Sequence, residues 1–318
     1  MKILITGCAG FIGFHTAIRM KKEGHEVYGI DSYNDYYDPE LKRARAKILE
    51  EHDIKVERID LFNHSSLVSY VFSIPKPDLV IHLAAYAGVR YSLQYPKLYI
   101  NNNIMGTNNL IKTCEDFGIH RVVYASTSCV MAGNPLPWKE DEKLGVPLSP
   151  YGYSKIANES QFHMSKLLMA VGLRFFTVYG PWGRPDMALF SFCDKIVKGE
   201  RIELFNYGNM KRDFTYVDDI VDGIVKVINH HNVYGERVRE IYNIGYGQQV
   251  ELMRFVDAIE KNLGREALKD MVPKHPADVD ETWSDTSKLQ AIGYKPTTSI
   301  EDGVEKFVEW YKDYYGVN

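Results

Sequence analysis

The chain has 318 residues, of which 45% are hydrophobic and 25% charged, so it can form one large or two modest globular domains. Its net charge of −4 predicts neither nucleic-acid nor membrane-surface binding. The four cysteines have no metal-ligand spacing, and the N-terminus has none of the features of a signal peptide. We therefore expect a cytoplasmic protein without a metal site.

The N-terminal segment predicts a dinucleotide-binding turn. An apolar run at residues 2–6 indicates a buried parallel strand, and a glycine-rich turn leads from it into a helix that ends near residue 23. Glycines at such a turn let the backbone approach a pyrophosphate at the positive end of the helix. The cofactor-binding residues predicted at this turn are Gly7, Gly10, Phe11, Ile12 and Gly13.

A carboxylate follows the next predicted strand. This strand covers residues 27–30 and ends at Asp31. An acid at this position accepts hydrogen bonds from a ribose diol and repels a 2′-phosphate, which favours NAD over NADP. The order of strand, glycines, helix, strand and terminal acid is far more specific than the glycines alone.

Helical and strand patterns then alternate, which predicts a Rossmann-type, doubly wound parallel sheet. We expect helices over 39–51, 103–117 and 151–170, and strands over 55–59, 78–82, 121–125 and 173–176. The pattern changes near residue 177, where a smaller C-terminal α/β domain is expected. Its predicted helices cover 190–198, 218–229, 250–263 and 299–314, and its strands 203–205 and 240–244. The cleft between the two domains is the expected ligand site.

Tyr151 and Lys155 are the first candidates for catalysis. Their spacing places both side chains on one face of a helix, one turn apart. An ammonium group beside a phenol favours the phenolate, so the pKa of Tyr151 should fall from about 10 toward neutrality. Such a phenol can take a proton from an alcohol or sugar hydroxyl. The pattern is short, and two residues on a solvated helix face would also explain it.

Further candidates follow the ends of the predicted strands, at the edge where open α/β sheets bind ligands. An acid after the third strand could reach an adenine amino group, and small residues after the fourth could let a flat cofactor pass. Hydroxyl groups after the fifth strand could bind substrate or simply cap the strand. These groups are Asp60-Leu61, Leu83-Ala84-Ala85 and Ser126-Thr127-Ser128.

Taken together, these features resemble an extended short-chain dehydrogenase/reductase of the nucleotide-sugar epimerase family. Longer blocks at residues 34–39, 87–92 and 174–187 are most similar to its UDP-glucuronate 4-epimerase group. The resemblance covers essentially the whole chain. It implies an NAD-binding domain at 1–176, onto which about 214–246 packs back, and a nucleotide-sugar-binding domain at 177–318.

The resemblance also implies an activity. This is NAD-dependent C4 epimerisation of UDP-glucuronate to UDP-galacturonate, through a transient 4-keto sugar, by a homodimer. Tyr151 would be the catalytic base and acid, Lys155 its activator, and Thr127 the hydroxyl bound to the reacting sugar oxygen. Lys155 would also hold the nicotinamide ribose, and Asn34 and Asn103 join the cofactor residues. The implied substrate residues are Arg90, Ser126, Thr127, Ser128, Thr177, Arg184, Arg212 and Asp278.

Several alternatives stay open at this point. A UDP-glucose or UDP-N-acetylhexosamine 4-epimerase would leave Arg184 without a carboxylate to bind, whereas a UDP-glucuronate decarboxylase typically has Glu at the position of Cys129. A non-catalytic NAD-binding regulator is a third. Dehydratases of the family follow the threonine with Asp-Glu, which is absent here. A departure from the family is Met131-Ala132, where Tyr-Gly is usual.

Overall fold

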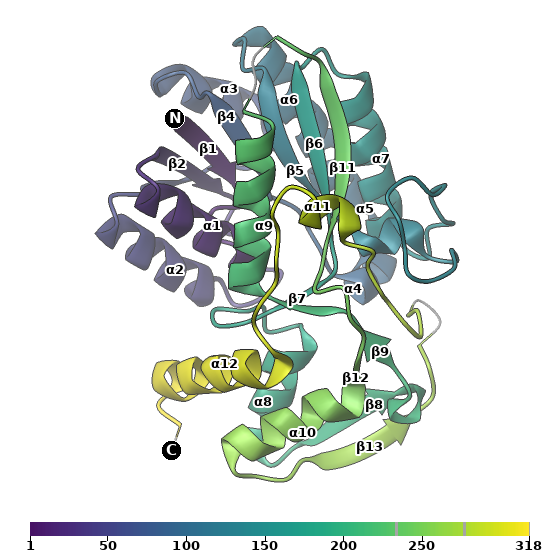
Figure 1. Cartoon of the computed structure of the whole chain (residues 1–318). Helices are drawn as coiled ribbons and strands as arrows, with labels where there is room; N and C mark the ends of the chain where they lie inside the picture. The colour runs from purple at the N-terminus through teal and green to yellow at the C-terminus, as the bar shows by residue number, and fades with distance from the viewer. Residues whose placement is uncertain (233–234, 276–277, 318) are drawn as a thin grey trace. The chain divides into compact units, whose positions relative to one another are not determined.

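The computed structural model describes residues 1–232, 235–275 and 278–317 (Figure 1). The chain forms two compact units, each assembled from separate segments. The first contains Met1–Gly133, Lys143–Phe175 and Ile224–Tyr242. The second contains Asn134–Glu142, Phe176–Gly223 and Asn243–Asn318.

A seven-stranded sheet in the order β11-β6-β5-β4-β1-β2-β3 forms the centre of the first unit. Its strands are β1 (Lys2–Thr6), β2 (Glu26–Asp31), β3 (Val56–Arg58), β4 (Leu79–His82), β5 (Arg121–Thr127), β6 (Met169–Phe175) and β11 (Val238–Ile244). The pairings from β3 through β6 are all parallel. The chain order reverses between β1 and β4, the point where such sheets bind ligands. This confirms the predicted Rossmann-type fold.

Helices cover both faces of this sheet (Figure 1). On one face α1 (Phe11–Lys22) packs on α2 (Pro39–Glu51), and on the other α6 (Gly106–Asp116) lies between α3 (His64–Ser73) and α7 (Pro150–Met164). Leu4, Val80, Val122 and Phe162 are among the buried residues that fill the second of these layers. Every residue of β5 and β6 is buried, as expected of strands that are covered on both faces.

The second unit contains three short strand pairs. They are β7 (Thr177–Tyr179) with β10 (Phe214–Tyr216), β8 (Arg201–Phe205) with β13 (Leu268–Val272), and β9 (Lys211–Arg212) with β12 (Val250–Glu251). Its helices are α8 (Ala188–Lys198), α10 (Leu252–Leu263), α11 (Ser287–Gln290) and α12 (Ile300–Tyr315). The helix α9 (Val217–His230) starts in this unit, and its residues from Ile224 onward belong to the first.

Some predicted boundaries were wrong. The helix predicted over 151–170 ends at Met164, and β6 begins at Met169, four residues before the predicted strand at 173. A continuous apolar run has no period that separates a buried strand from a helix, which explains this error. The predicted helix at 250–263 begins with the two residues of β12, and the prediction missed α3 and β13.

The helix predicted from residue 103 begins earlier, as a π-helix over Ile100–Met105 that continues into α6. Two short helices precede it, α4 (Val89–Gln94) and α5 (Pro96–Tyr99). Across the described ranges, no helix is both long and apolar enough to span a membrane.

Candidate active site

The glycine turn after β1 is closely packed. Gly7 has a φ of +70°, and a Cβ placed there would lie 2.7 Å from the backbone nitrogen of Ala84. A Cβ on Gly13 would lie 2.1 Å from the carbonyl oxygen of Gly7. Gly10 is the N-cap of α1, and among the described side chains none caps this helix start. Phe11 and Ile12 form the first turn, so this turn presents backbone N–H groups that suit a pyrophosphate.

Asp31 lies at the end of β2, beside the glycine turn. Its carboxylate accepts hydrogen bonds from the N–H groups of Ala9 (3.1 Å) and Tyr33 (2.9 Å). Burial raises the pKa of Asp31, and the positive charges of Lys42 and Arg45 oppose that rise. A buried acceptor beside a glycine turn fits the ribose end of a dinucleotide.

Lys42 and Arg45 were not among the predicted site residues. Arg45 is fully buried and donates to the carbonyl oxygen of Ala9 (2.9 Å) and to the hydroxyl of Tyr37 (2.8 Å). The Lys42 ammonium donates to the carbonyl and side-chain oxygens of Asn34, both at 2.7 Å. Lys42 and Arg45 lie three residues apart on α2, so helical spacing predicts that they share one face of the helix. They fix the glycine turn and the loop that carries Asn34.

Two further cofactor candidates follow β3. The exposed Asp60 accepts a hydrogen bond from the N–H of Phe62 (2.9 Å), whereas Leu61 is buried beside Gly106 of α6. After β4, Leu83 donates its N–H to the carbonyl of Thr6, and Ala84 donates to the Thr6 hydroxyl. These contacts hold Leu83 and Ala84 against the end of β1, and Ala85 follows directly in the chain.

Two buried polar residues, Asn103 and His82, connect elements of the first unit through hydrogen bonds. Asn103, in the π-helix, pairs with both backbone groups of Tyr86 and also donates to the hydroxyl of Ser154 on α7, all at 2.9 Å. Its amide therefore links the segment after β4 to α7. These bonds hold the two segments in place, whereas the sequence predicted that Asn103 binds the cofactor. His82 links Thr6 (2.7 Å) to Thr107 of α6 (2.9 Å), and burial lowers the pKa of His82 to about 3.

Tyr151 and Lys155 lie in the first turns of α7. The helix begins at Pro150, and the hydroxyl of Ser149 caps it by accepting from the N–H of Gly152 (3.2 Å). Tyr151 is buried in a cluster with Tyr86 and Tyr99. Lys155 is 2% exposed, and its ammonium donates to the carbonyl of Ala125 on β5 (2.9 Å).

Lys155 also carries an altered acidity. Burial lowers its pKa to about 8, and the negative charge of Glu159, one turn further along α7, opposes that fall. Thr127 ends β5 two residues after Ala125, and its hydroxyl accepts from the N–H of Cys129 (3.3 Å). Because the Lys155 bond joins α7 to β5, the structure brings the predicted base, activator and hydroxyl to neighbouring elements.

The hydroxyl groups of Ser126 and Ser128 differ in their surroundings. Ser126 is 1% exposed and donates to the carboxylate of Glu159 (2.5 Å). Ser128 opens the 3-10 helix Ser128–Met131, which directly follows β5. Ser126 therefore contacts a buried carboxylate on α7.

The remaining substrate candidates are divided between the units. Arg90 is exposed on α4 of the first unit. In the second unit Arg184 binds Asp186 in fork geometry, with nitrogen–oxygen distances of 3.0 and 2.5 Å.

Arg212 lies elsewhere in the second unit. It donates to the carbonyl groups of Val279 and Asp280, next to Asp278. Thr177 opens β7, and its N–H donates to the carbonyl of Asp213 (3.1 Å).

Asp213 organises this part of the second unit. Its buried carboxylate accepts from the N–H groups of Tyr246 and Gly247 and from the N–H and hydroxyl of Ser284. Burial raises the pKa of Asp213, and these bonds oppose that rise. These bonds hold the backbone at Asp213, and therefore also the position of Arg212, the residue before it.

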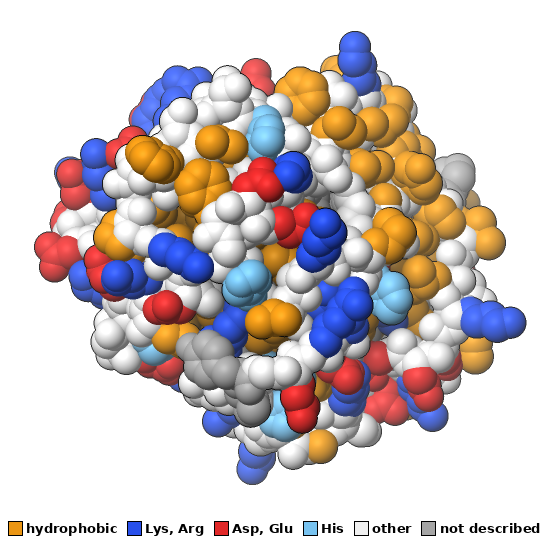
Figure 2. Space-filling view, turned by 90° about the horizontal axis from the view of Figure 1, so that it is seen from above, with side chains coloured by type: hydrophobic (Ala, Val, Ile, Leu, Met, Phe, Trp, Pro, Cys, Tyr) orange, Lys and Arg blue, Asp and Glu red, His pale blue; other side chains and the backbone are white. Residues whose placement is uncertain are grey.

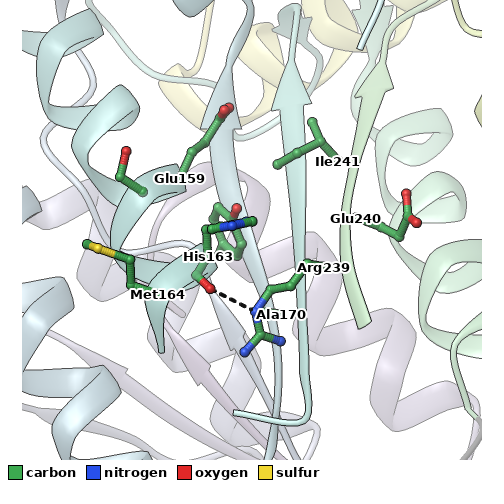
Figure 3. Close-up of a pocket in the computed structure, with 9 residues that line it drawn as sticks. Glu159, His163, Met164, Ala170, Arg239, Glu240 and Ile241 are labelled. Atoms are coloured by element: carbon green, nitrogen blue, oxygen red, sulfur yellow. Dashed lines mark hydrogen bonds between the residues drawn. The ribbon is translucent and has the colours of Figure 1, made fainter. Parts of the chain in front are cut away.

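A pocket of about 430 Å³ lies along the C-terminal half of α7, next to β11 (Figure 3). Glu159 and His163 line it from α7, and Arg239 lines it from β11. The Arg239 guanidinium donates to several carbonyl groups at the end of α7, among them those of His163 (3.3 Å) and Ser165 (2.9 Å). It therefore caps the C-terminus of α7. In the described part of the chain, no three His, Cys, Asp or Glu side chains are grouped to hold a metal ion.

A Rossmann-type sheet with a glycine turn, a buried acid at the end of β2, and a tyrosine and a lysine buried one turn apart on α7 is typical of dinucleotide-dependent enzymes. Residues 3–245 match the family described as "NAD dependent epimerase/dehydratase family", and the chain belongs to that family.

Curated relatives and solved structures agree with this assignment. Protein CapI of Staphylococcus aureus is 44% identical in an alignment that covers 99% of each chain. A probable UDP-glucuronate 4-epimerase of Rhizobium meliloti (strain 1021) is 40% identical, covering 99% of this chain and 98% of the relative. The crystal structure of UDP-glucuronic acid 4-epimerase from Bacillus cereus, in complex with UDP-glucuronic acid and NAD, has a TM-score of 0.90 at 34% identity. It covers 99% of this chain and 100% of that one.

Proposed function

We propose that this protein interconverts UDP-glucuronate and UDP-galacturonate by NAD-dependent epimerisation at C4. The observation that carries the proposal is that Tyr151 and Lys155 are buried one turn apart on α7, with Lys155 bonded to Ala125 of β5. They lie in the unit that also contains the glycine turn and Asp31. The similarity to UDP-glucuronate 4-epimerases supports the choice of substrate.

The first unit has features that suit the cofactor. The glycine turn has no space for a Cβ at Gly7 or Gly13, and Asp31 is an acceptor for the adenosine ribose. Held by these residues, NAD would supply the hydride acceptor and donor for the oxidation and re-reduction of C4 of the sugar. We assign NAD to this unit and the nucleotide sugar chiefly to the second, through Thr177, Arg184, Arg212 and Asp278.

The catalytic residues handle the proton of the C4 hydroxyl. Tyr151 takes this proton in the first half of the cycle and gives it back in the second. The positive charge on Lys155, one helical turn away, stabilises the phenolate form of Tyr151. Thr127 donates a hydrogen bond to the reacting sugar oxygen, which holds it in line with the base.

The charge of Lys155 predicts the alkaline side of the pH profile. Below a pKa of about 8 Lys155 is protonated and supports Tyr151, and above that value the charge is lost. We expect kcat to fall as the pH rises through about 8, measured from initial rates at saturating UDP-glucuronate. A kcat that stays constant up to pH 10 would contradict this role.

Arg184 is proposed to select the uronate. It already holds a carboxylate, that of Asp186, with two of its guanidinium nitrogens. A 4-keto uronate is a β-keto acid, which loses CO₂ when its carboxylate stands perpendicular to the ketone plane. A two-point grip by Arg184 would hold the carboxylate in an unreactive orientation, with Thr177 and Ser128 as helpers.

Replacing Arg184 with His removes the fork while keeping a potential positive charge. We expect Arg184→His to weaken UDP-glucuronate binding, with a KM increase of about tenfold or more, and to release UDP-pentose as a side product. Product analysis by NMR checks this. Unchanged epimerisation with unchanged KM would refute the assignment, and Arg201→His, at an exposed ion pair with Asp270, is the control.

Separate incubations with UDP-glucuronate, UDP-glucose and UDP-xylose test the proposed substrate, with products resolved by NMR. We expect a C4 epimer from UDP-glucuronate and little conversion of the two sugars that lack a carboxylate. Efficient conversion of UDP-glucose instead would identify a UDP-glucose 4-epimerase.

We also propose that the protein is a cytoplasmic homodimer. Ile100 and Met105, next to α6, and Tyr153 and Met164, on α7, are between 45% and 72% exposed. Hydrophobic side chains gather along the right-hand side of Figure 2, the side on which α7 lies in Figure 1. A second copy would cover this surface, and sedimentation velocity distinguishes a dimer from the 36.5 kDa monomer.

A further inference from the structure

An ion pair is buried beneath the candidate active site, and the catalytic steps above do not use it. Arg174 of β6 and Glu159 of α7 are joined in fork geometry, with both nitrogen–oxygen distances at 3.0 Å. Their side chains are 4% and 9% exposed. Figure 3 shows Glu159 at one end of the pocket beside α7.

The pair contacts each element that carries a proposed catalytic group. Glu159 lies one turn after Lys155 on α7, and it accepts a hydrogen bond from Ser126, the residue before Thr127. A further nitrogen of Arg174 lies 3.1 Å from the sulfur of Met131, in the 3-10 helix that follows Thr127. The end of β5, the third turn of α7 and the end of the 3-10 helix are therefore joined through one ion pair.

Stability alone does not account for this arrangement. Removing two charges from water costs several kcal/mol per ion, and well-packed apolar residues often replace a buried ion pair without loss of stability. An apolar pair could fill the space between α7 and β6, but it could neither accept a hydrogen bond from Ser126 nor place a negative charge one turn from Lys155.

We propose that Glu159 and Arg174 are positioning residues for the epimerisation. Glu159 orients the Ser126–Thr127 strand end toward the reacting sugar oxygen and keeps Lys155 in its ammonium form, while Arg174 holds the Glu159 carboxylate in place. This inference rests on the proposed function, because it concerns the same proton transfer.

The surroundings of Lys155 give the sign of the electrostatic effect. Glu159 and Tyr151 lie near Lys155 on the same helix, α7, and the neutral His82 lies near it on β4. Arg174 on β6 binds Glu159, so its positive charge is close to Lys155 as well. Loss of the Glu159 charge leaves the Arg174 cation unbalanced near Lys155, and both changes favour the neutral amine. Loss of both charges together removes most of that imbalance.

Three variants separate charge from position. In Glu159→Gln we expect the alkaline limb of the kcat profile to move down by about one pH unit. In Glu159→Gln with Arg174→Met the limb should return toward its wild-type position. In Glu159→Asp, which keeps the charge but shortens the side chain, the limb should stay in place while kcat falls about tenfold at unchanged KM.

The matched control is another fork-shaped pair, Arg254 with Glu301, which is exposed in the second unit. Glu301→Gln should change neither kcat nor the pH profile. Circular dichroism and bound NAD verify folding of each variant, and if Glu159→Gln does not fold, Glu159→Asp decides the outcome. If the folded Glu159 variants keep both the wild-type kcat and the wild-type alkaline limb of the pH profile, the positioning role is wrong. Absence of activity in the wild-type enzyme would instead overturn the proposed function.

Discussion

Tyr151→Phe is expected to lower kcat for UDP-glucuronate epimerisation by about 10³-fold or more, because the ring remains but the group that takes the C4 proton is lost. KM and the amount of bound NAD should change little, since Tyr151 lies in an aromatic cluster that phenylalanine also fills. Steady-state kinetics and the absorbance of extracted NAD measure both quantities.

Tyr153→Phe is the matched control for this variant. Tyr153 lies on the same helix, two residues further along, but it is 53% exposed. Its loss of a hydroxyl should leave kcat within about twofold of the wild type, because the Tyr153 hydroxyl has no part in the proposed proton transfer and the ring remains for the proposed dimer contact. Equal rates for Tyr151→Phe and the wild type would remove Tyr151 from the mechanism.

Gly13→Ala is expected to produce the second large effect, the loss of the cofactor. The added methyl group would lie 2.1 Å from the carbonyl oxygen of Gly7, a backbone atom that can move only if the whole turn moves. A displacement of about 1 Å at a positioning element can lower the rate about 100-fold. We expect a comparable or larger loss of NAD affinity, measured by isothermal titration calorimetry.

The control adds the same methyl group at the other end of α1. A Cβ on Gly24 would meet no described atom within 4 Å, although its φ of +82° makes alanine locally unfavourable by about 1 kcal/mol. Gly24→Ala should therefore lower stability slightly and leave NAD affinity unchanged. Equal NAD affinity in both variants would contradict the placement of the pyrophosphate at the glycine turn.

The local features of the first unit could be predicted because single residues determine them. Gly7 and Gly13 stand where any side chain would strike the backbone, so the turn is visible in sequence. Asp31 ends a strand whose apolar pattern is clear, and the spacing of Tyr151 and Lys155 is helical. These features fix the fold class and the region of the predicted site.

Contacts between distant residues could not be predicted in the same way. Glu159 has the same spacing from Lys155 as Lys155 has from Tyr151, but its partner Arg174 lies on another element, and no local pattern pairs them. The fully buried Arg45 is similar, since a charged residue in a helix is usually exposed. The end of α7 was missed because Ser165 leaves the helix without a glycine or proline to mark the change.

The central claim is most directly tested with UDP-glucuronate that carries deuterium at C4. Incubation with the enzyme and NAD, followed by NMR, should show UDP-galacturonate that keeps the deuterium at C4, because the same hydride leaves and returns during one cycle. A product that has exchanged this deuterium for hydrogen, or no UDP-galacturonate at all, would contradict an epimerisation in which Tyr151 moves only the hydroxyl proton.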